Sequence, residues 1–236
     1  MESSVLRTMP LHAITEVHGE RGLRARFALE IADLPEPERE QLERALALAG
    51  ELHRDDRRVR EPYVNHLLRV AIRIIHYYRV RDPDVLAAAL LHDAVEDHAD
   101  ELGGGTEAGL ATLASRFNPR VAALVGAVTN PAYDPERDAH EQYREHVASS
   151  LAGDPWARVI KVSDFTDNGV GVIHTTGPKV RGAAAKYAPL VPILRELVAL
   201  PDTPLQDEVR QHIFDQLDLA DERFRAILGT GSAQGK

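Results

Sequence analysis

The sequence contains no cysteine. This absence excludes a disulfide framework, a zinc–thiolate site and a cysteine nucleophile, so a protein-bound metal would have to use histidine, aspartate or glutamate. It also suits a reducing compartment, and we expect the protein to be cytoplasmic.

Long apolar runs are absent as well. No stretch of 18 apolar residues occurs, and the N-terminus "MESSVLRTMPLHAITEV" has no hydrophobic segment, so we expect neither a membrane span nor a signal peptide. Basic residues are fewer than acidic ones, 28 against 37, which gives a net charge of −9. We therefore expect no general nucleic-acid binding, which depends on neutralising many phosphates. The sequence identifies no protein partner.

Helical periodicity dominates the 236 residues, and the strict alternation typical of strands is scarce. We predict an all-α fold with one compact body, because 44% of the residues are hydrophobic and the chain is long enough to bury a core. The predicted division is an N-terminal extension (1–35, with no clear period), a main domain (36–200), appended C-terminal helices (201–228) and a flexible tail (229–236). Within the main domain the predicted helices are 36–53, 64–79, 82–97, 109–117, 119–130 and 154–168.

Two of these helices begin with the dipeptide Asp-Pro. Asp82 and Asp154 are predicted N-caps, and the prolines that follow occupy the first helical position, where a missing N–H costs nothing.

The segment "LAAALLHDAVED" places titratable residues directly after an apolar run. On a continuous helix, His92 and Glu96 form one stacked pair, and Asp93 and Asp97 form another. The simplest interpretation is the polar face of an amphipathic helix. However, the preceding "VLAAALL" is apolar nearly all round and predicts a buried helix. Buried carboxylates need compensation, and a divalent cation would supply it.

Two further residues could complete such a site. His66 lies in the apolar "YVNHLLRVA", and Asp164 follows the apolar positions of "VIKVSDFTDN". Each has a structural alternative, because a lone histidine on an apolar helix is usually a core residue and a lone aspartate near a helix end is usually a surface group.

The order of these residues is His66, then the His92–Asp93 pair 26 residues later, then Asp164 a further 71 residues on. It resembles the HD superfamily of metal-dependent phosphohydrolases. It is most similar to the hydrolase domain of the RelA/SpoT alarmone enzymes and to the small alarmone hydrolases. The resemblance extends from about residue 40 to about residue 198 and rests on the motifs "EPYVNH", "AAALLHDAVED", "VAALVGAVTN", "VIKVSDFTDN" and "KYAPLV".

This resemblance implies a compact multi-helix HD fold and a set of roles. His66, His92, Asp93 and Asp164 match the metal ligands, which in this family usually hold Mn²⁺. Glu96 and Asp97 match the catalytic acidic pair, and Asn168 matches a nucleotide-contacting asparagine. The implied reaction removes pyrophosphate from the ribose 3′ position of guanosine tetra- or pentaphosphate and leaves GDP or GTP.

The sequence departs from the family where base and phosphates would be held. "DFTDN" stands for Asp-Arg-Leu-His-Asn, and "DDRRVR" is one residue shorter than the family's segment. Arg57 and Arg58 are therefore candidates for substrate contact, with a solvated basic loop as the alternative. Three further candidate cations are Lys161, Lys179 and Arg181.

We expect a stand-alone hydrolase without synthetase activity, since about 38 residues follow the region of resemblance. Two alternatives stay open. One is another HD nucleotide phosphatase, for example an NADPH 2′-phosphatase, and the other is a catalytically silent nucleotide-binding module.

Overall fold

The computed structural model describes residues 2–174, 177 and 179–229. Over these residues the regular elements are helices, which confirms the predicted all-α fold, and the extended pairing is limited to one isolated bridge between Arg57 and Pro62. The chain divides into two compact units, Met1–Thr129 and Asn130–Lys236. The predicted boundaries near residues 35 and 200 stay predictions.

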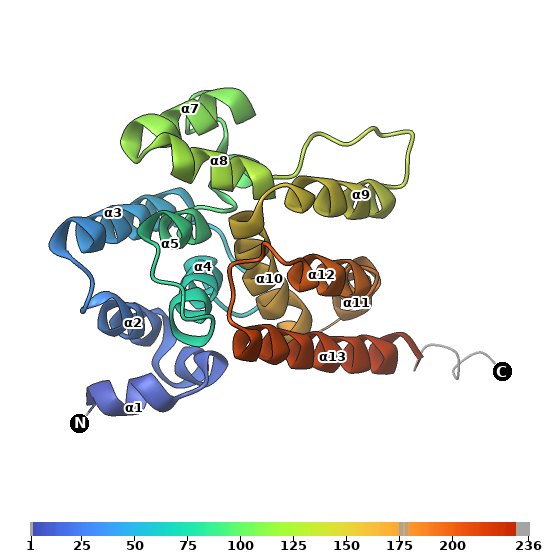
Figure 1. The fold of residues 1–236 in the computed structure, drawn as a ribbon, viewed down its shortest axis with the longest axis horizontal. Helices are drawn as coiled ribbons and strands as arrows, with labels where there is room; N and C mark the ends of the chain where they lie inside the picture. The colour runs from blue at the N-terminus through green and yellow to red at the C-terminus, as the bar shows by residue number, and fades with distance from the viewer. Residues whose placement is uncertain (1, 175–176, 178, 230–236) are drawn as a thin grey trace. The chain divides into compact units, whose positions relative to one another are not determined.

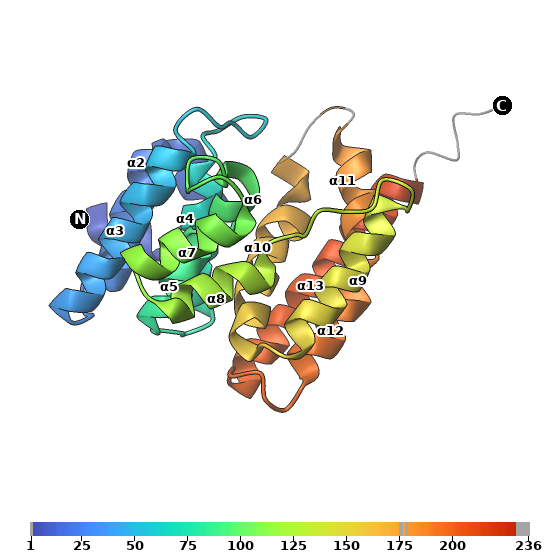
Figure 2. The same ribbon diagram turned by 90° about the horizontal axis from the view of Figure 1, so that it is seen from above.

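The first unit is built around a short central helix, α4 (Figures 1 and 2). Helix α4 packs against α2 and α5, and α5 also packs against α3 and α8. All nine residues of α4 are buried, so the polar residue His66 on this helix lies in the core of the unit. The helices are α1 (Glu2–Thr8), α2 (Leu11–Ile31), α3 (Glu36–Leu52), α4 (Val64–Ile72, followed by a π-helical turn Arg73–Tyr77), α5 (Pro83–Leu90), α6 (Ala94–His98), α7 (Thr106–Arg116) and α8 (Pro119–Val128).

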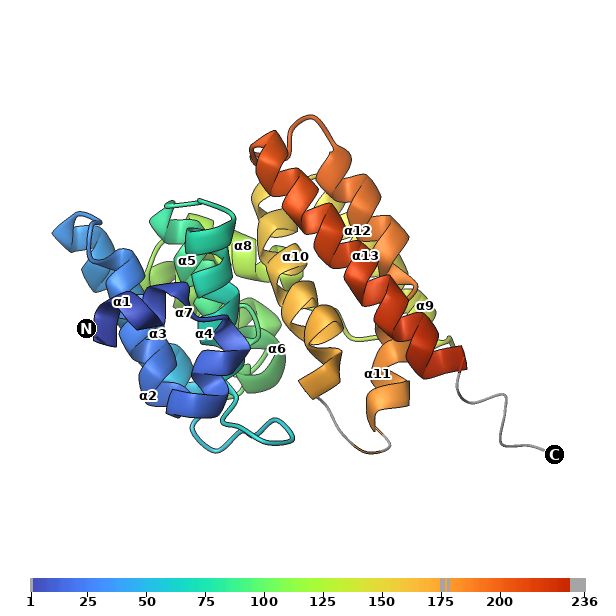
Figure 3. The ribbon, with the colours of Figure 1, turned by 90° about the horizontal axis from the view of Figure 1, so that it is seen from below.

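The second unit is arranged around α10, which contacts α9, α11, α12 and α13 (Figure 3). Twelve of its fifteen residues are buried, so α10 is the core helix of this unit. The helices are α9 (Ala139–Ala152), α10 (Pro155–Gly169, followed by a 3₁₀ turn Val170–His174), α11 (Lys179–Tyr187), α12 (Leu190–Ala199) and α13 (Asp207–Gly229).

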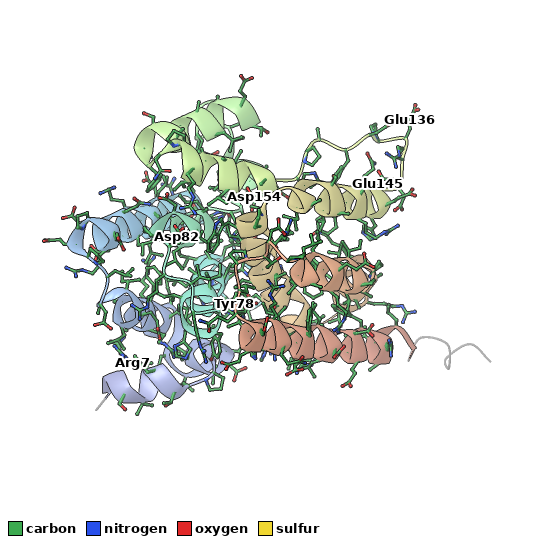
Figure 4. All side chains as sticks on the ribbon, in the orientation of Figure 1. Arg7, Tyr78, Asp82, Glu136, Glu145 and Asp154 are labelled. Atoms are coloured by element: carbon green, nitrogen blue, oxygen red, sulfur yellow. The ribbon has the colours of Figure 1, made fainter. Side chains whose placement is uncertain are left out.

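Both predicted Asp-Pro helix starts are confirmed. The carboxylate of Asp82 accepts hydrogen bonds from the backbone N–H groups of Asp84 and Val85, and that of Asp154 accepts from Trp156 and Ala157. Figure 4 labels Asp82 and Asp154 at the beginnings of α5 and α10. These caps satisfy N–H groups that have no partner within their own helix.

The prediction of one helix over 82–97 is wrong. Helix α5 ends at Leu90, the next three residues form turns, and α6 begins at Ala94. Leu91 leaves the helical region with φ −108° and ψ 7°. The His92 ring contributes to the break, because its Nδ1 lies 2.8 Å from the carbonyl oxygen of Ala89. The turn separates the apolar α5 from the acidic α6.

The N-terminal extension, which showed no clear sequence period, is helical in α1 and α2. A kink at Gly19, whose φ of 60° favours glycine, interrupts α2 and breaks the period there. At the other end, α13 extends through Gly229, and the rest of the predicted tail lies outside the described residues. None of the described helices combines the length and the apolar character that a membrane crossing requires.

A partly buried carboxylate joins three helices of the first unit. Oδ1 of Asp84 in α5 accepts 2.8 Å hydrogen bonds from Gln41 in α3 and from Asn118, which caps α8. Arg120 lies 3.2 Å from Oδ2. Burial alone would raise the pKa of Asp84, but the hydrogen bonds from Asn118, Gln41 and Arg120 outweigh it and lower the pKa.

We predict that Asp84→Ala reduces the free energy of unfolding by about 1–3 kcal/mol, because two side-chain amides lose their acceptor. The depressed pKa means that the contribution is present above the unfolded-state pKa and is lost as the pH falls through the folded-state value. The difference between the variant and the wild type should therefore be constant near neutral pH and shrink below about pH 4. Urea unfolding over this pH range measures it. Asp55→Ala, at an exposed position, is the control and should change stability by less than about 0.5 kcal/mol; an equal effect of both changes would contradict the assignment.

Candidate functional site

The first candidate ligand, His66, is fixed by the way α4 begins. Glu61 precedes the helix and forms a bidentate salt bridge with Arg69 one turn inside it, with both N–O distances 2.7 Å. This pair holds the "EPY" segment against α4 and places Tyr63 at the N-cap. His66 then follows in the first turn with 1% of its surface exposed.

Asp93 and His92 lie beside His66. Nε2 of His92 is 3.0 Å from Oδ2 of Asp93, and Nε2 of His66 is 3.8 Å from the same oxygen. The two imidazole rings meet edge to face with centroids 5.3 Å apart. The structure therefore brings three of the four predicted metal ligands together within the first unit.

Tyr63 also belongs to this cluster, although no role was predicted for it. Its hydroxyl donates a 2.7 Å hydrogen bond to Oδ2 of Asp93. Burial and then the negative charge of Asp93 raise the pKa of Tyr63, so the phenol stays protonated and acts as a donor. Although the "EPYVNH" motif contained this tyrosine, no spacing rule connects it with an aspartate 30 residues further on.

Glu96 and Asp97 occupy the first turn of α6 and are exposed. The expectation that the whole acidic cluster lies on a buried helix is therefore wrong, because the turn at residues 91–93 carries both residues to the surface. Partial desolvation of its carboxyl group, followed by repulsion from Asp93 and Glu96, raises the pKa of Asp97 to about 6. Such a carboxyl can hold or release a proton near neutral pH.

In the second unit, Asp164 is buried in α10 and held from both sides. Nζ of Lys161 lies 3.0 Å from Oδ2, and the amide of Asn168 donates a 2.6 Å hydrogen bond to Oδ1. These residues lie one turn before and one turn after Asp164, as the sequence placed them. Lys161 also lies over the ring of Tyr143, with its Nζ 5.6 Å from the centroid.

The other four candidate cations, Arg57, Arg58, Lys179 and Arg181, lie in different surroundings. Arg57 is exposed, whereas the guanidinium of Arg58 packs over the Tyr63 ring at 5.9 Å. Lys179 is exposed at the start of α11. Arg181 donates hydrogen bonds of 3.2 and 3.1 Å to the carbonyl oxygens of Ile227 and Leu228 at the end of α13.

A second cluster in the first unit joins residues that the sequence did not single out. Oδ2 of Asp56 lies 2.8 Å from Nδ1 of His53 and 2.7 Å from Nε2 of His98. Burial lowers the pKa of His53. The carboxylates of Asp56 and Glu101 outweigh the effect of burial on His98 and raise its pKa. Asp56 and His98 are 42 residues apart, so no local pattern reveals the cluster.

The donor set around Asp93 fits a divalent metal ion. Two imidazoles and a carboxylate are ligands for Mn, Fe or Zn. The contact between Nδ1 of His92 and the Ala89 carbonyl leaves Nε2 as the nitrogen that faces Asp93, an arrangement typical of metal-binding histidines.

Residues 45–153 match the family model of the HD domain. This match agrees with the HD class that the motifs predicted.

Two curated relatives share one enzyme name. The guanosine-3′,5′-bis(diphosphate) 3′-pyrophosphohydrolase of Aquifex aeolicus is 35% identical over 160 residues, which are 64% of this chain and 21% of that protein. The Drosophila melanogaster enzyme of the same name, MESH1, is 33% identical over 126 residues, 52% of this chain and 64% of that protein. The chain thus spans about a fifth of one relative and just under two thirds of the other.

A solved structure supports the same comparison. It is described as a metazoan ortholog of SpoT that hydrolyses ppGpp, and it superposes with a TM-score of 0.56 at 27% sequence identity, covering 76% of this chain and 96% of that chain.

The contact between Tyr63 and Asp93 generates a prediction about metal affinity. Tyr63→Phe removes the hydroxyl that fixes the Asp93 carboxylate, so Mn²⁺ affinity should fall by about 10- to 100-fold, the usual effect of losing a group that orients a ligand. Titration of metal-free protein with Mn²⁺ measures this loss. Tyr133→Phe, which removes a hydroxyl bonded to Asn130 instead, is the control. Equal affinities for the two variants would show that Tyr63 does not support the site.

Proposed function

We propose that this protein is a metal-dependent phosphohydrolase. Its substrate is guanosine tetra- or pentaphosphate or a close analogue, from which it releases pyrophosphate and GDP or GTP. The observation that carries the proposal is the convergence of Tyr63, His66 and His92 on Asp93 inside an HD domain. Support for the substrate comes from the relatives that carry this activity in their names. The cysteine-free composition supports a cytoplasmic location.

In this proposal His66, His92 and Asp93 bind the metal, and Asp164 is the fourth ligand because it fills the corresponding position of the motif "VIKVSDFTDN". We assign the metal as Mn²⁺ on the same resemblance. A bound divalent cation lowers the pKa of a coordinated water toward neutrality and polarises phosphoryl oxygens.

Two acidic side chains of the protein, Glu96 and Asp97, would accept and donate the protons of the reaction. Glu96 and Asp97 are exposed at the start of α6, next to Asp93 in the chain, where they can meet a substrate. Asp97, with a pKa of about 6, can accept a proton from the attacking water, and Glu96 or Asp97 can return one to the departing 3′ oxygen. Tyr63 holds Asp93 in place through its hydrogen bond.

Substrate binding needs further cations, because the substrate carries several phosphates. We assign this role to Arg57, Arg58, Lys161, Lys179 and Arg181, and we assign Asn168 to the ribose. In the structure Asn168 and Lys161 contact Asp164, so each would act as a positioning group for that carboxylate as well.

One observation favours a second candidate, another HD nucleotide phosphatase such as an NADPH 2′-phosphatase. Phe165 stands where the resembling family has arginine, and it is buried against the rings of Tyr187 and Phe224. This position therefore offers an apolar core contact in place of a cation, and a different arrangement of phosphates could be preferred.

We predict that the protein with Mn²⁺ releases pyrophosphate from nucleotides that carry a 3′-diphosphate. Chromatography of the products from a panel of guanine and adenine 3′-diphosphates, plain 5′-nucleotides and NADPH identifies the bond that breaks. Orthophosphate release from NADPH, with the 3′-diphosphates intact, would favour the second candidate. Nucleotide binding without turnover of any compound would indicate a silent binding module.

We predict that Glu96→Gln lowers turnover by about 100-fold or more while Mn²⁺ stays bound, because glutamine keeps the size of the side chain but cannot exchange a proton. Asp97→Asn should behave in the same way. Asp164→Ala is the contrasting variant, since loss of a ligand should remove both metal and activity. Rates measured beside metal content separate the two outcomes; near-normal turnover of Glu96→Gln with metal bound would contradict a catalytic role for α6.

A further inference from the structure

The cluster of His53, Asp56 and His98 lies outside the site described above, and its geometry is that of a metal-binding group. Each residue offers one ligand atom, and the three atoms lie within 4.8 Å of one another. A four-coordinate zinc ion with bonds of about 2.0–2.2 Å places its ligands about 3.3 Å apart. The two N–O distances, 2.8 and 2.7 Å, would open by about half an ångström, which side-chain rotation can supply.

The backbone prepares this arrangement. His53 follows α3 directly, and a turn that is closed by the Asp56 N–H and the His53 carbonyl brings the two side chains to the same side. A second backbone bond, from the N–H of Tyr63 to the carbonyl of Asp56, fixes the far side of the turn. His98 comes from the last position of α6. The ligands are thus held by two helix ends and a closed turn.

His98 is oriented as metal-binding histidines usually are, and the ring of His53 packs against it edge to face. His98 presents Nε2 to the cluster, while its Nδ1 lies 3.2 Å from the carboxylate of Glu101, which can accept the N–H of that nitrogen. His53 is 2% exposed, and its ring is stacked on Tyr63 with centroids 4.8 Å apart. Its Nε2 is buried and has no hydrogen-bond partner among the described residues, so a positively charged His53 would leave a buried N–H without an acceptor. A neutral imidazole that binds a metal through Nδ1 carries its ring proton on Nε2, so the metal–nitrogen bond has to offset the cost of this buried N–H.

The exposure and charge of the cluster also suit a cation. The side chain of Asp56 is 38% exposed and that of His98 is 12% exposed, so an ion can reach the three donors from solvent. Glu101 and the acidic residues of α6 lie close by in the chain and would help to balance a divalent charge.

We propose that His53, Asp56 and His98 form a second metal site, which binds a divalent transition-metal ion of the Zn²⁺ type with water in the remaining position. Two imidazoles and one carboxylate match the ligand preference of Zn²⁺, whereas Mg²⁺ and Ca²⁺ prefer oxygen alone. The ion would take the place of the protons that the two rings now share with Asp56.

The site would connect two functional segments of the first unit. Asp56 belongs to the loop 53–63, which carries Arg57 and Arg58, and His98 ends the helix that carries Glu96 and Asp97. A metal bound to both would fix the arginine loop against the acidic helix.

The test compares Zn²⁺ content among three versions of the full chain: wild type, Asp56→Asn and His140→Gln. Asparagine preserves the shape of the aspartate at a half-exposed position, and His140, exposed at the start of α9, is a matched control for loss of a histidine elsewhere. Each protein is stripped with a chelator, incubated with a small excess of Zn²⁺, desalted and analysed for zinc per chain. Circular dichroism confirms that each version stays helical, and His98→Gln provides a second variant of the cluster.

We expect Asp56→Asn and His98→Gln to hold one Zn²⁺ fewer per chain than the wild type, and His140→Gln to hold the same number. This difference does not depend on whether the site at Asp93 also takes zinc, nor on the activity of the protein. Zn²⁺ should also slow tryptic cleavage after Arg57 and Arg60 in the wild type and not in Asp56→Asn. If all versions hold the same number of zinc ions, the cluster is an ion pair only and the proposal is wrong.

Discussion

The carboxylate of Asp93 is the contact on which the candidate site of the first unit depends. One of its oxygens faces the Tyr63 hydroxyl, His92 and His66 at 2.7, 3.0 and 3.8 Å. A partly buried carboxylate in such a place is costly unless donors or a cation surround it. The neighbouring structure supplies the donors: the salt bridge between Glu61 and Arg69 holds the tyrosine, and the buried α4 holds His66.

The turn between α5 and α6 places the two halves of the motif "LAAALLHDAVED" in different environments, one buried and one exposed. Helix α5 is apolar and buried from Val85 through Leu90, whereas Glu96 and Asp97 reach the surface on α6. A continuous helix could not have done both, because residues four apart would have stayed on one buried face. The break therefore permits buried ligands and exposed acidic groups within six residues of sequence. Desolvation of its carboxyl group, followed by repulsion from Asp93 and Glu96, raises the pKa of Asp97.

The sequence predicted the features that depend on local chemistry. Asp-Pro at residues 82–83 and 154–155 indicated two helix starts, because cap and proline act within one turn. The end of α5 escaped prediction, since "LLHD" contains neither glycine nor proline and the break depends on a histidine side chain that contacts Ala89. The roles of Tyr63 and of the cluster at Asp56 depend on pairs 30 and 42 residues apart, which only the packing of helices brings together. The motif order, by contrast, predicted the resemblance to the HD domain, whose family model matches residues 45–153.

Pulsed electron paramagnetic resonance of the Mn²⁺-loaded protein tests whether His66 and His92 bind the metal, because it detects nitrogen nuclei bound to the ion. We expect couplings from two imidazole nitrogens in the wild type, reduced to one in His66→Ala and in His92→Ala. A spectrum without nitrogen couplings, or one that neither substitution alters, would contradict the assignment of these histidines as the metal ligands.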